Sequence, residues 1–127
     1  MRPTEQITWL YVADLDHSRA FYCTALGLDV TLEQPTCCIL RITDTAFLGL
    51  CARPEPRQTP GLLLCFIVAD VAAAHDRLLR AGATRDSPPR HNPTYAIEHA
   101  FVRDPDGHRV EVQRFLDPSW KTSHPSA

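Results

Sequence analysis

The sequence has no run of lysine or arginine residues and little net charge. Its 127 residues carry 13 basic and 15 acidic side chains, which gives a formal net charge of −2. Proteins that bind nucleic acid or anionic membrane surfaces concentrate positive charge on one face or segment. The charge pattern therefore argues against both nucleic acid and membrane as partners.

Long apolar stretches are also lacking. No segment approaches the ~20 apolar residues that a membrane-spanning helix needs. The first residues, MRPTEQITWLYVADLD, do not contain a basic region followed by a sustained apolar stretch, as a secretory signal peptide does. We therefore expect a cytoplasmic protein, and the composition, 44% hydrophobic and 22% charged, is typical of one globular domain.

The cysteines lack a pairing pattern. There are five, an odd number, and no two form a CxxC motif: Cys23, Cys37, Cys38, Cys51 and Cys65. A secreted disulfide framework or a structural metal site normally has an even or closely spaced set. We therefore expect free thiols, most of them packed as small apolar side chains in strands. Cys37 and Cys38 are neighbours, so they are expected to point to opposite faces of a strand.

What the sequence does contain is an internal repeat. VADLDHSRAFYCTALGL (residues 12–28) and VADVAAAHDRLLRAGA (68–83) align at an offset of 56 residues with one deletion. A strand-like run, QITWLYV or LLLCFIV, leads into each copy, and each copy has an acidic N-cap and a closing glycine. The expected caps and stops are Asp14 or Asp16, Asp70, Gly27 and Gly82. Each copy is therefore predicted to be a strand followed by a helix.

Three further strand candidates follow each helix. They are LDVTLEQ, CCILRIT and AFLGLCA in the first half, and the ATRDS region, TYAIEHAFVR and HRVEVQRF in the second. Each half is therefore predicted to be a βαβββ module, and the fold class to be α+β. We predict a single domain, 1–127, with module 1 at about 5–53, a linker at 54–61, module 2 at about 62–116 and a C-terminal tail at 117–127. SPPRHNP, residues 87–93, is predicted to be a mobile loop.

Two motifs accompany the repeat. The first helix contains DLDHSRAFYCTALG and the last hairpin contains DPDGHRVE. With these motifs on a duplicated βαβββ unit, the chain resembles the vicinal oxygen chelate superfamily, which includes glyoxalase I, extradiol dioxygenases, fosfomycin-modifying enzymes and bleomycin-resistance-type binding proteins. The resemblance extends from about Ile7 to Phe115. It implies a glyoxalase/bleomycin-resistance-like open barrel of paired strands with flanking helices.

The resemblance also gives positions for a metal site. In the metalloenzymes of this superfamily, the first and last strands of each half supply ligands to one divalent ion. Carried onto this sequence, the positions are Ile7, Gly49, Leu63 and Glu111. One carboxylate does not hold a catalytic ion, which normally takes about three or four N, O or S ligands. We therefore predict no metal and no cofactor, and metal-dependent glyoxalase or dioxygenase activity is disfavoured.

The six histidines show none of the spacings of a metal site. They are His17, His75, His91, His99, His108 and His124. For five of them we expect a solvated surface position. His99 differs, because the DPDG turn, with Gly107 as its left-handed residue, sets the register of the last hairpin. This register places Phe101 opposite Glu111 and His99 opposite Gln113, so that all four share one face.

Strand alternation extends this face to the other strands. The opposite face is almost purely aliphatic, as packing against helices requires: Thr8, Leu10, Val12, Leu48, Leu50, Leu64, Phe66, Val68, Val110 and Val112. The predicted ligand-binding residues are Trp9, Tyr11, Phe47, Cys51, Cys65, His99, Phe101, Arg109, Glu111 and Gln113. Such a mixture of aromatic and polar side chains is typical of a pocket for an apolar, partly aromatic ligand.

We therefore expect a binding protein rather than an enzyme, with no catalytic residue assigned. Its function would be metal-independent binding and sequestration of a bulky, partly aromatic small molecule, an antibiotic or other natural product, in a resistance or carrier role. The resemblance further implies a homodimer with ligand grooves shared between chains. The alternative is a metal-free enzyme of the isomerase or lyase type that uses Glu111 and His99 as acid and base. An inert reading, in which the inward aromatic side chains only fill the barrel, also stays open.

Overall fold

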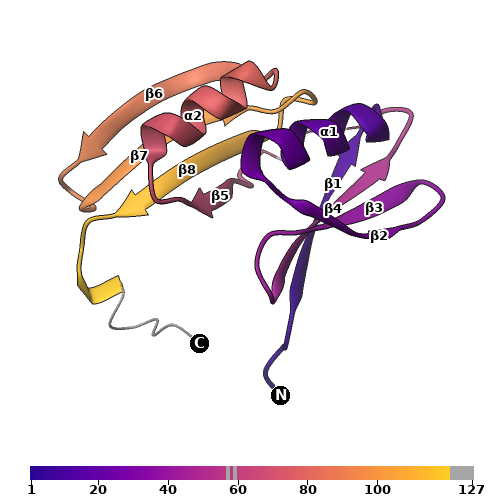
Figure 1. Ribbon diagram of the computed structural model, residues 1–127, viewed down its shortest axis with the longest axis horizontal. Coiled ribbons are helices and arrows are strands. Elements are labelled where there is room, and N and C mark those ends of the chain that lie inside the picture. Colours follow the sequence, from indigo (N-terminus) through magenta and orange to yellow (C-terminus); the bar gives the residue numbers. More distant parts are fainter. Residues whose placement is uncertain (57, 59, 121–127) are drawn as a thin grey trace.

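The chain forms two βαβββ halves, as the repeat predicts. The computed structural model describes residues 1–56, 58 and 60–120. The first half contains β1 (Gln6–Val12), α1 (Leu15–Leu26), β2 (Asp29–Glu33), β3 (Cys37–Arg41) and β4 (Ala46–Ala52). The second half contains β5 (Leu64–Ile67), α2 (Val71–Arg80), β6 (Thr84–Asn92), β7 (Ile97–Arg103) and β8 (Arg109–Phe115). Figure 1 shows the two halves beside each other.

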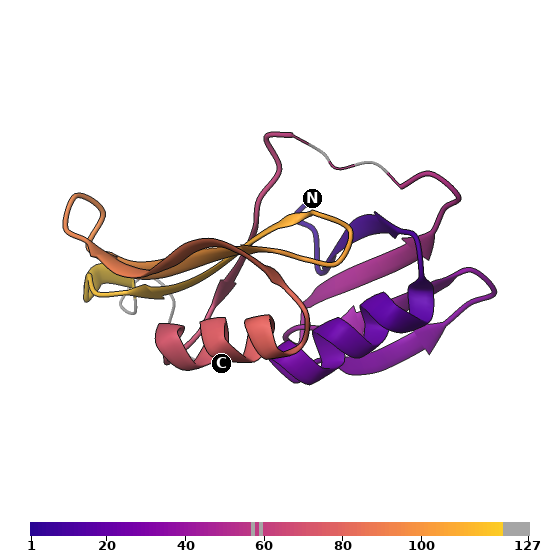
Figure 2. The same cartoon turned by 90° about the horizontal axis from the view of Figure 1, so that it is seen from above.

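Each half builds its own four-stranded sheet. The strand orders are β1-β4-β3-β2 in sheet 1 and β5-β8-β7-β6 in sheet 2. The first strand of each half pairs in parallel with the last, and the other pairs are antiparallel. Both helices lie on the same side of the two sheets (Figure 2). The sheets are not closed into a barrel, so each sheet keeps one face without a helix, which we call its open face.

The core lies between the sheets and the helices. Seven residues of the predicted helix-facing set are buried: Leu10, Val12, Leu48, Leu50, Phe66, Val110 and Val112. Phe21, Tyr22, Val71 and Leu78 meet them from the helices. Full burial of such a side chain contributes about 1.5–3 kcal/mol. The predicted alternation of the strands is therefore confirmed for these residues.

The helix starts and the last hairpin follow from local sequence. Asp14 and Asp70 are the N-caps, and the side chain of each accepts a hydrogen bond of 3.0 Å from a backbone N–H in the first turn of its helix. Gly27 ends α1 in the left-handed conformation, with φ of 68°. Gly107 is left-handed in the DPDG turn, and Phe101 pairs with Glu111 as predicted. Among the described residues, no helix is long and apolar enough to cross a membrane.

The predicted mobile loop at 87–93 is wrong. Strand β6 continues through this segment to Asn92, and the turn follows at residues 93–96. The register of β6 against β7 shifts between Ser87 and Arg90, where Pro88 and Pro89 stand. Prolines are tolerated there because β6 is an edge strand and a bulge needs fewer backbone donors.

The prediction of five free thiols is also wrong. Cys37 and Cys51 form a disulfide, while Cys23, Cys38 and Cys65 are free. The two paired cysteines stand directly opposite each other on β3 and β4, with Cα atoms 4.2 Å apart. Because disulfides are rare in reducing compartments, cysteine usage no longer supports a cytoplasmic location.

Two of the five histidines expected at the surface are buried. His75 is 6% exposed under sheet 2, and His108 is 7% exposed. The Nε2 atom of His108 lies 2.9 Å from the carbonyl oxygen of Tyr11, so this histidine joins the second half of the chain to β1. His17 and His91 are exposed as expected, and His124 lies outside the described residues.

Candidate functional site

The open face of sheet 1 carries an exposed aromatic surface. Trp9 is 43% exposed and Tyr11 48% exposed, on alternate positions of β1. Phe47, half-buried, stands beside Ile7 on the neighbouring strand β4. Exposed aromatic side chains gathered on one sheet face are candidates for a ligand or partner surface.

The indole ring of Trp9 lies over the backbone of Gly49. The two residues are paired across β1 and β4, and a Cβ atom at position 49 would lie 2.6 Å from Cδ2 of Trp9. A side chain at position 49 therefore has no room while the ring holds this place. The ring thus takes the space of one of the four metal-ligand positions named above.

Arg53 is a member of this face that the sequence reasoning missed. Its guanidinium carbon lies 4.7 Å from the centre of the Tyr11 ring, and its Nη1 atom is 3.0 Å from Sγ of Cys51. A guanidinium over an aromatic face adds an attraction of about 0.5–1 kcal/mol at an exposed site. Its position in the sequence, directly after the strand β4, could have identified Arg53 as a neighbour of this face.

The open face of sheet 2 contains a buried pair, Glu111 and His99. Oε2 of Glu111 lies 2.7 Å from Nδ1 of His99, and the two residues are 6% and 7% exposed. A carboxylate only accepts hydrogen bonds, so Nδ1 carries the hydrogen. The Nε2 atom of His99 is buried and has no hydrogen-bond partner among the described residues. Leaving such an atom unpaired costs about 1–3 kcal/mol.

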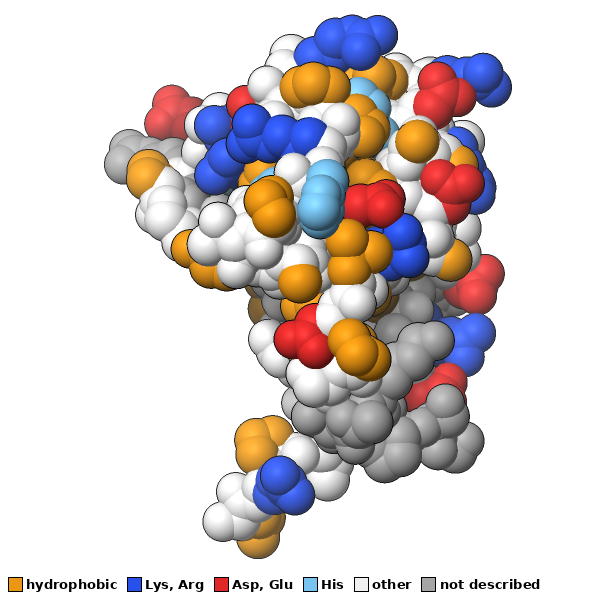
Figure 3. Space-filling view, turned by 90° about the vertical axis from the view of Figure 1, so that its left-hand side faces the viewer, with side chains coloured by type: hydrophobic (Ala, Val, Ile, Leu, Met, Phe, Trp, Pro, Cys, Tyr) orange, Lys and Arg blue, Asp and Glu red, His pale blue; other side chains and the backbone are white. Residues whose placement is uncertain are grey.

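The other predicted residues of sheet 2 surround this pair. The ring of Phe101 meets that of His99 edge to face, with centres 5.0 Å apart, and the guanidinium of Arg109 lies 4.4 Å over Phe101. Sγ of Cys65 is 3.6 Å from the side-chain oxygen of Gln113. Figure 3 shows hydrophobic, histidine and charged side chains mixed over the end of the molecule where sheet 2 lies.

Cys65 is an inert thiol by its surroundings. Burial of its sulfur, followed by the negative charge of Glu111 and a hydrogen bond to it, raises the pKa of Cys65 to about 12. The thiolate is the nucleophilic form, so a thiol with this pKa is unreactive near neutral pH. We therefore assign Cys65 to the wall of the site and not to its chemistry.

The C-terminal end of β8 is also covered. The ring of Trp120 stacks on Phe115 at the end of β8, with ring centres 4.0 Å apart and an interplanar angle of 20°. Phe115 follows Glu111 and Gln113 on alternate positions of the strand, and therefore lies on the open face. Trp120 thus extends the aromatic surface of sheet 2.

The donor set does not fit the divalent ion of the superfamily's metalloenzymes. Of the four carried-over positions, Ile7, Gly49 and Leu63 have no side-chain lone pair, and the carboxylate of Glu111 is held by His99. Among the described residues, no group of three or more His, Cys, Asp or Glu side chains is arranged to hold a metal. A catalytic site needs about three protein ligands and an open position.

The remaining motif residues join the two halves. The Tyr22 hydroxyl donates to Oδ2 of Asp104 at 2.5 Å, and the Ser18 hydroxyl donates to Oδ2 of Asp106 at 3.1 Å. The backbone N–H of Ala13 donates to Oδ1 of Asp106 at 2.9 Å. Burial raises the pKa of both Tyr22 and Asp104. These residues hold the DPDG hairpin against the start of α1, while Glu111 from the same motif reaches an open face.

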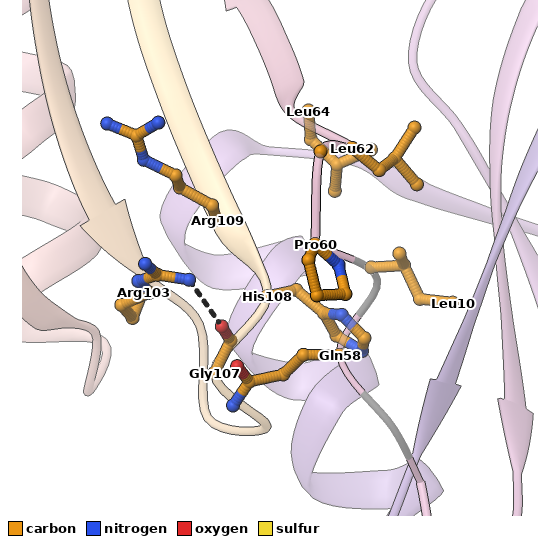
Figure 4. A pocket seen from close by; sticks show the side chains of 10 residues that line it. Leu10, Gln58, Pro60, Leu62, Leu64, Arg103, Gly107, His108 and Arg109 are labelled. Carbon is orange, nitrogen blue, oxygen red and sulfur yellow. Dashed lines mark hydrogen bonds between the residues drawn. The ribbon is translucent and has the colours of Figure 1, made fainter.

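Two of the cavities in the described part of the chain are lined by predicted site residues. One of about 340 Å³ is enclosed by the linker and the last hairpin, and Arg109 lines it (Figure 4). The other, of about 630 Å³, is lined by Phe47 from sheet 1 and Cys65 from sheet 2, together with aliphatic residues. The larger cavity therefore touches a predicted site residue from each sheet, whereas the side-chain contacts described above for the two open faces each lie within one sheet.

Comparison with known proteins identifies a family and similar solved structures. The family model of the glyoxalase/bleomycin resistance protein/dioxygenase superfamily matches residues 5–112. A glyoxalase/bleomycin resistance protein from Albidiferax ferrireducens superposes with a TM-score of 0.74 at 21% identity, covering 85% of this chain and 95% of that chain. A family enzyme from Burkholderia phytofirmans gives 0.77 at 20% identity, covering 87% and 97%.

The fosfomycin resistance protein FosX from Listeria monocytogenes gives a TM-score of 0.76 at 16% identity, covering 90% of this chain and 94% of that chain. No curated protein matches the chain. At these identities the similar structures establish the fold, and the roles of the open faces follow from the chain's own residues.

Proposed function

Because the chain belongs to the glyoxalase/bleomycin resistance protein/dioxygenase superfamily, we propose that it binds and sequesters a bulky, partly aromatic small molecule without a metal ion, in a resistance or carrier role. The observation that carries the proposal is the Trp9 ring, which lies over Gly49 and is 43% exposed. A large exposed ring on a sheet face offers a stacking surface for an aromatic ligand. FosX, a fosfomycin resistance protein of the same fold, supports the resistance role.

The predicted residues divide into two kinds of contact in this proposal. Trp9, Tyr11, Phe47 and Phe101 stack on the ligand, and His99, Arg109, Glu111 and Gln113 orient its polar groups. The sulfur atoms of Cys51 and Cys65 complete the walls. A Kd near 1 μM corresponds to about −8 kcal/mol, which a few stacked rings and one charged hydrogen bond can supply. Binding alone is then sufficient for sequestration.

The proposal includes a homodimer with grooves shared between chains. In one chain both open faces leave large apolar side chains exposed, including Ile7 at 40% and Ile67 at 50%. A second copy related by a two-fold axis would bring the open face of sheet 1 opposite the open face of sheet 2 in its partner. Each groove would then combine aromatic and polar contacts from two chains.

Native mass spectrometry of the untagged protein, purified from its own host, tests this proposal. We expect a dimer that carries an organic molecule with aromatic character and no stoichiometric metal. The same spectrum recorded after mild acid release identifies the mass of the retained molecule. A stoichiometric metal ion, or repeated preparations with no retained molecule, would contradict the proposal.

The Glu111–His99 pair favours a second candidate function. A carboxylate on Nδ1 of a histidine whose buried Nε2 has no partner among the described residues resembles the arrangement of a general base, so the pair supports a metal-free isomerase or lyase step. Glu111→Gln separates the two candidates. If the protein is an enzyme, this change abolishes product formation from the retained molecule while its affinity stays nearly constant. If the protein only binds, the wild type forms no product.

A further inference from the structure

Two arginines stand at the base of the last hairpin and share one carboxylate. Arg103 and Arg109 are directly opposite each other on β7 and β8. Nε of Arg109 is 3.3 Å from Oδ2 of Asp86, and Nε of Arg103 is 3.8 Å from the same atom. Two guanidinium groups therefore share one carboxylate at this point of the open face.

The other nearby carboxylates are already engaged. Glu111 is bonded to His99, and Asp104 accepts the hydroxyl hydrogen of Tyr22 as well as two backbone N–H groups. Asp106 accepts hydrogen bonds from α1 and from the residue before Asp14. Each of these carboxylates therefore has its own hydrogen-bond partners, and within the described part of the chain Arg103 and Arg109 are paired only with Asp86.

Arg109 also has unused hydrogen-bonding capacity. Its Nε donates to Asp86, but its two Nη groups have no acceptor among the described residues, and its side chain is 44% exposed. In Figure 4 the side chain of Arg109 points away from Pro60 and His108, whereas Nη1 of Arg103 donates to the carbonyl oxygen of Gly107 at 3.2 Å. The guanidinium carbon of Arg109 lies 4.4 Å from the centre of the Phe101 ring, so the ring packs against the guanidinium. The planar guanidinium of Arg109, with its Nη donors unused among the described residues, is thus held beside Phe101, one of the residues proposed to stack on the ligand.

We propose that Arg109, with Arg103 beside it, binds an oxyanion of the ligand, so that the ligand is an aromatic acid bearing a carboxylate or phosphate group. The planar guanidinium matches two oxygens of such a group, and its charge strengthens both hydrogen bonds. This inference rests on the proposed function, because the aromatic part of the ligand uses the stacking surface described above. Asp86 competes for the same guanidinium when no ligand is bound.

Isothermal titration with naphthalene carboxylate and the matching neutral carboxamide tests the inference. We expect the wild type to bind the carboxylate at least tenfold more tightly than the carboxamide. Arg109→Gln should remove this difference, and Arg109→Lys should restore only part of it because an ammonium lacks the planar pair of donors. Arg114→Gln is the matched control: Arg114 lies on the same strand with 42% of its side chain exposed, but pairs with Glu98. It should leave the preference unchanged.

Asp86→Asn gives a test of opposite sign. Removing the competing carboxylate should tighten carboxylate binding severalfold and leave carboxamide binding unchanged. Equal binding of both probes by the wild type, or a preference that survives Arg109→Gln, overturns the anion inference while the proposed function stands. Failure of both probes to bind counts against the inference and the proposed function together.

Discussion

The open faces of the two sheets have the same architecture and different chemistry. Sheet 1 presents aromatic rings, including Trp9 and Tyr11, with a disulfide between its two central strands. Sheet 2 presents a buried ionisable pair, Glu111 and His99. The opposite faces of both sheets are alike, since both pack aliphatic side chains against a helix. The repeat therefore keeps the core pattern and, in the proposed function, divides the ligand contacts between its halves.

One pair of equivalent positions shows how the difference arises. In sheet 1 Trp9 stands beside Gly49, and in sheet 2 Cys65 stands beside Glu111 at the corresponding points of the parallel strand pairs. A large ring goes with a missing side chain in one half, and a small thiol goes with a carboxylate in the other. Similar space is thus filled by an apolar group from the first strand or by a polar group from the last.

Removal of the Trp9 ring from sheet 1 should have the largest effect on ligand affinity. Trp9→Ala is expected to weaken ligand binding at least tenfold, because it removes the stacking surface of sheet 1. Since the ring is 43% exposed, the thermal unfolding midpoint should change little. Tyr95→Ala is the control, as Tyr95 is 71% exposed in the turn after β6 and lies on neither open face. Unchanged affinity in Trp9→Ala would remove the stacking role.

The cysteines of the two sheets should differ in reactivity, because sheet 1 contains a disulfide and sheet 2 contains the free thiol Cys65. Denatured without reductant, the protein is expected to show three free thiols, and with reductant five. In the folded protein at about pH 8, Cys65 should react with iodoacetamide at least tenfold more slowly than in the unfolded chain, because its pKa is raised from 9.0 to about 12. Peptide mass spectrometry measures both. Five free thiols without reductant would refute the disulfide.

The same pKa shift predicts the direction of a stability change at high pH. As the pH rises above 9.0, the unfolded chain loses the Cys65 proton first, while the folded protein keeps it until about 12. The unfolded state is therefore favoured progressively over this range. Cys65→Ala should show a smaller loss of unfolding free energy over the same pH range, as measured by urea denaturation.

The smallest effect is expected for His75, a buried residue of α2, and concerns the stability of the fold. Burial lowers its pKa below the ordinary value of 6.5, so on acidification the unfolded chain gains this proton before the folded protein does. The stabilising contribution of neutral His75 is present above 6.5 and lost as the pH falls through the lowered pKa. His75→Leu should therefore reduce the fall in melting temperature between neutral pH and about pH 5, by a few degrees. His17→Leu, at an exposed position of α1, should leave that fall unchanged.

Features with a local signal were predictable from the sequence. Asp14 and Asp70 fix the helix starts through hydrogen bonds within one turn, and Gly107 fixes the last hairpin through its positive φ. The repeat then gives the same order of elements twice. The pairing of Phe101 with Glu111 follows from these local rules.

Features that depend on non-local contacts were not predictable. The Cys37–Cys51 pair depends on the register of β3 against β4, for which the intervening loop has no motif comparable to DPDG. The burial of His75 and His108 depends on how α2 and the hairpin pack against the rest of the chain. The contact of Tyr22 with Asp104 joins residues 82 positions apart, and only the folded chain brings them together.

The central claim is that the aromatic face of sheet 1 and the polar face of sheet 2 hold the same ligand. A nitrogen-15 NMR titration with the neutral naphthalene carboxamide tests it, following the indole N–H of Trp9 and the side-chain amide of Gln113, with Trp9→Phe to assign the indole signal. We predict that both signals shift along one binding curve with the same Kd. Shifts on one face alone, or two different Kd values, would contradict the account.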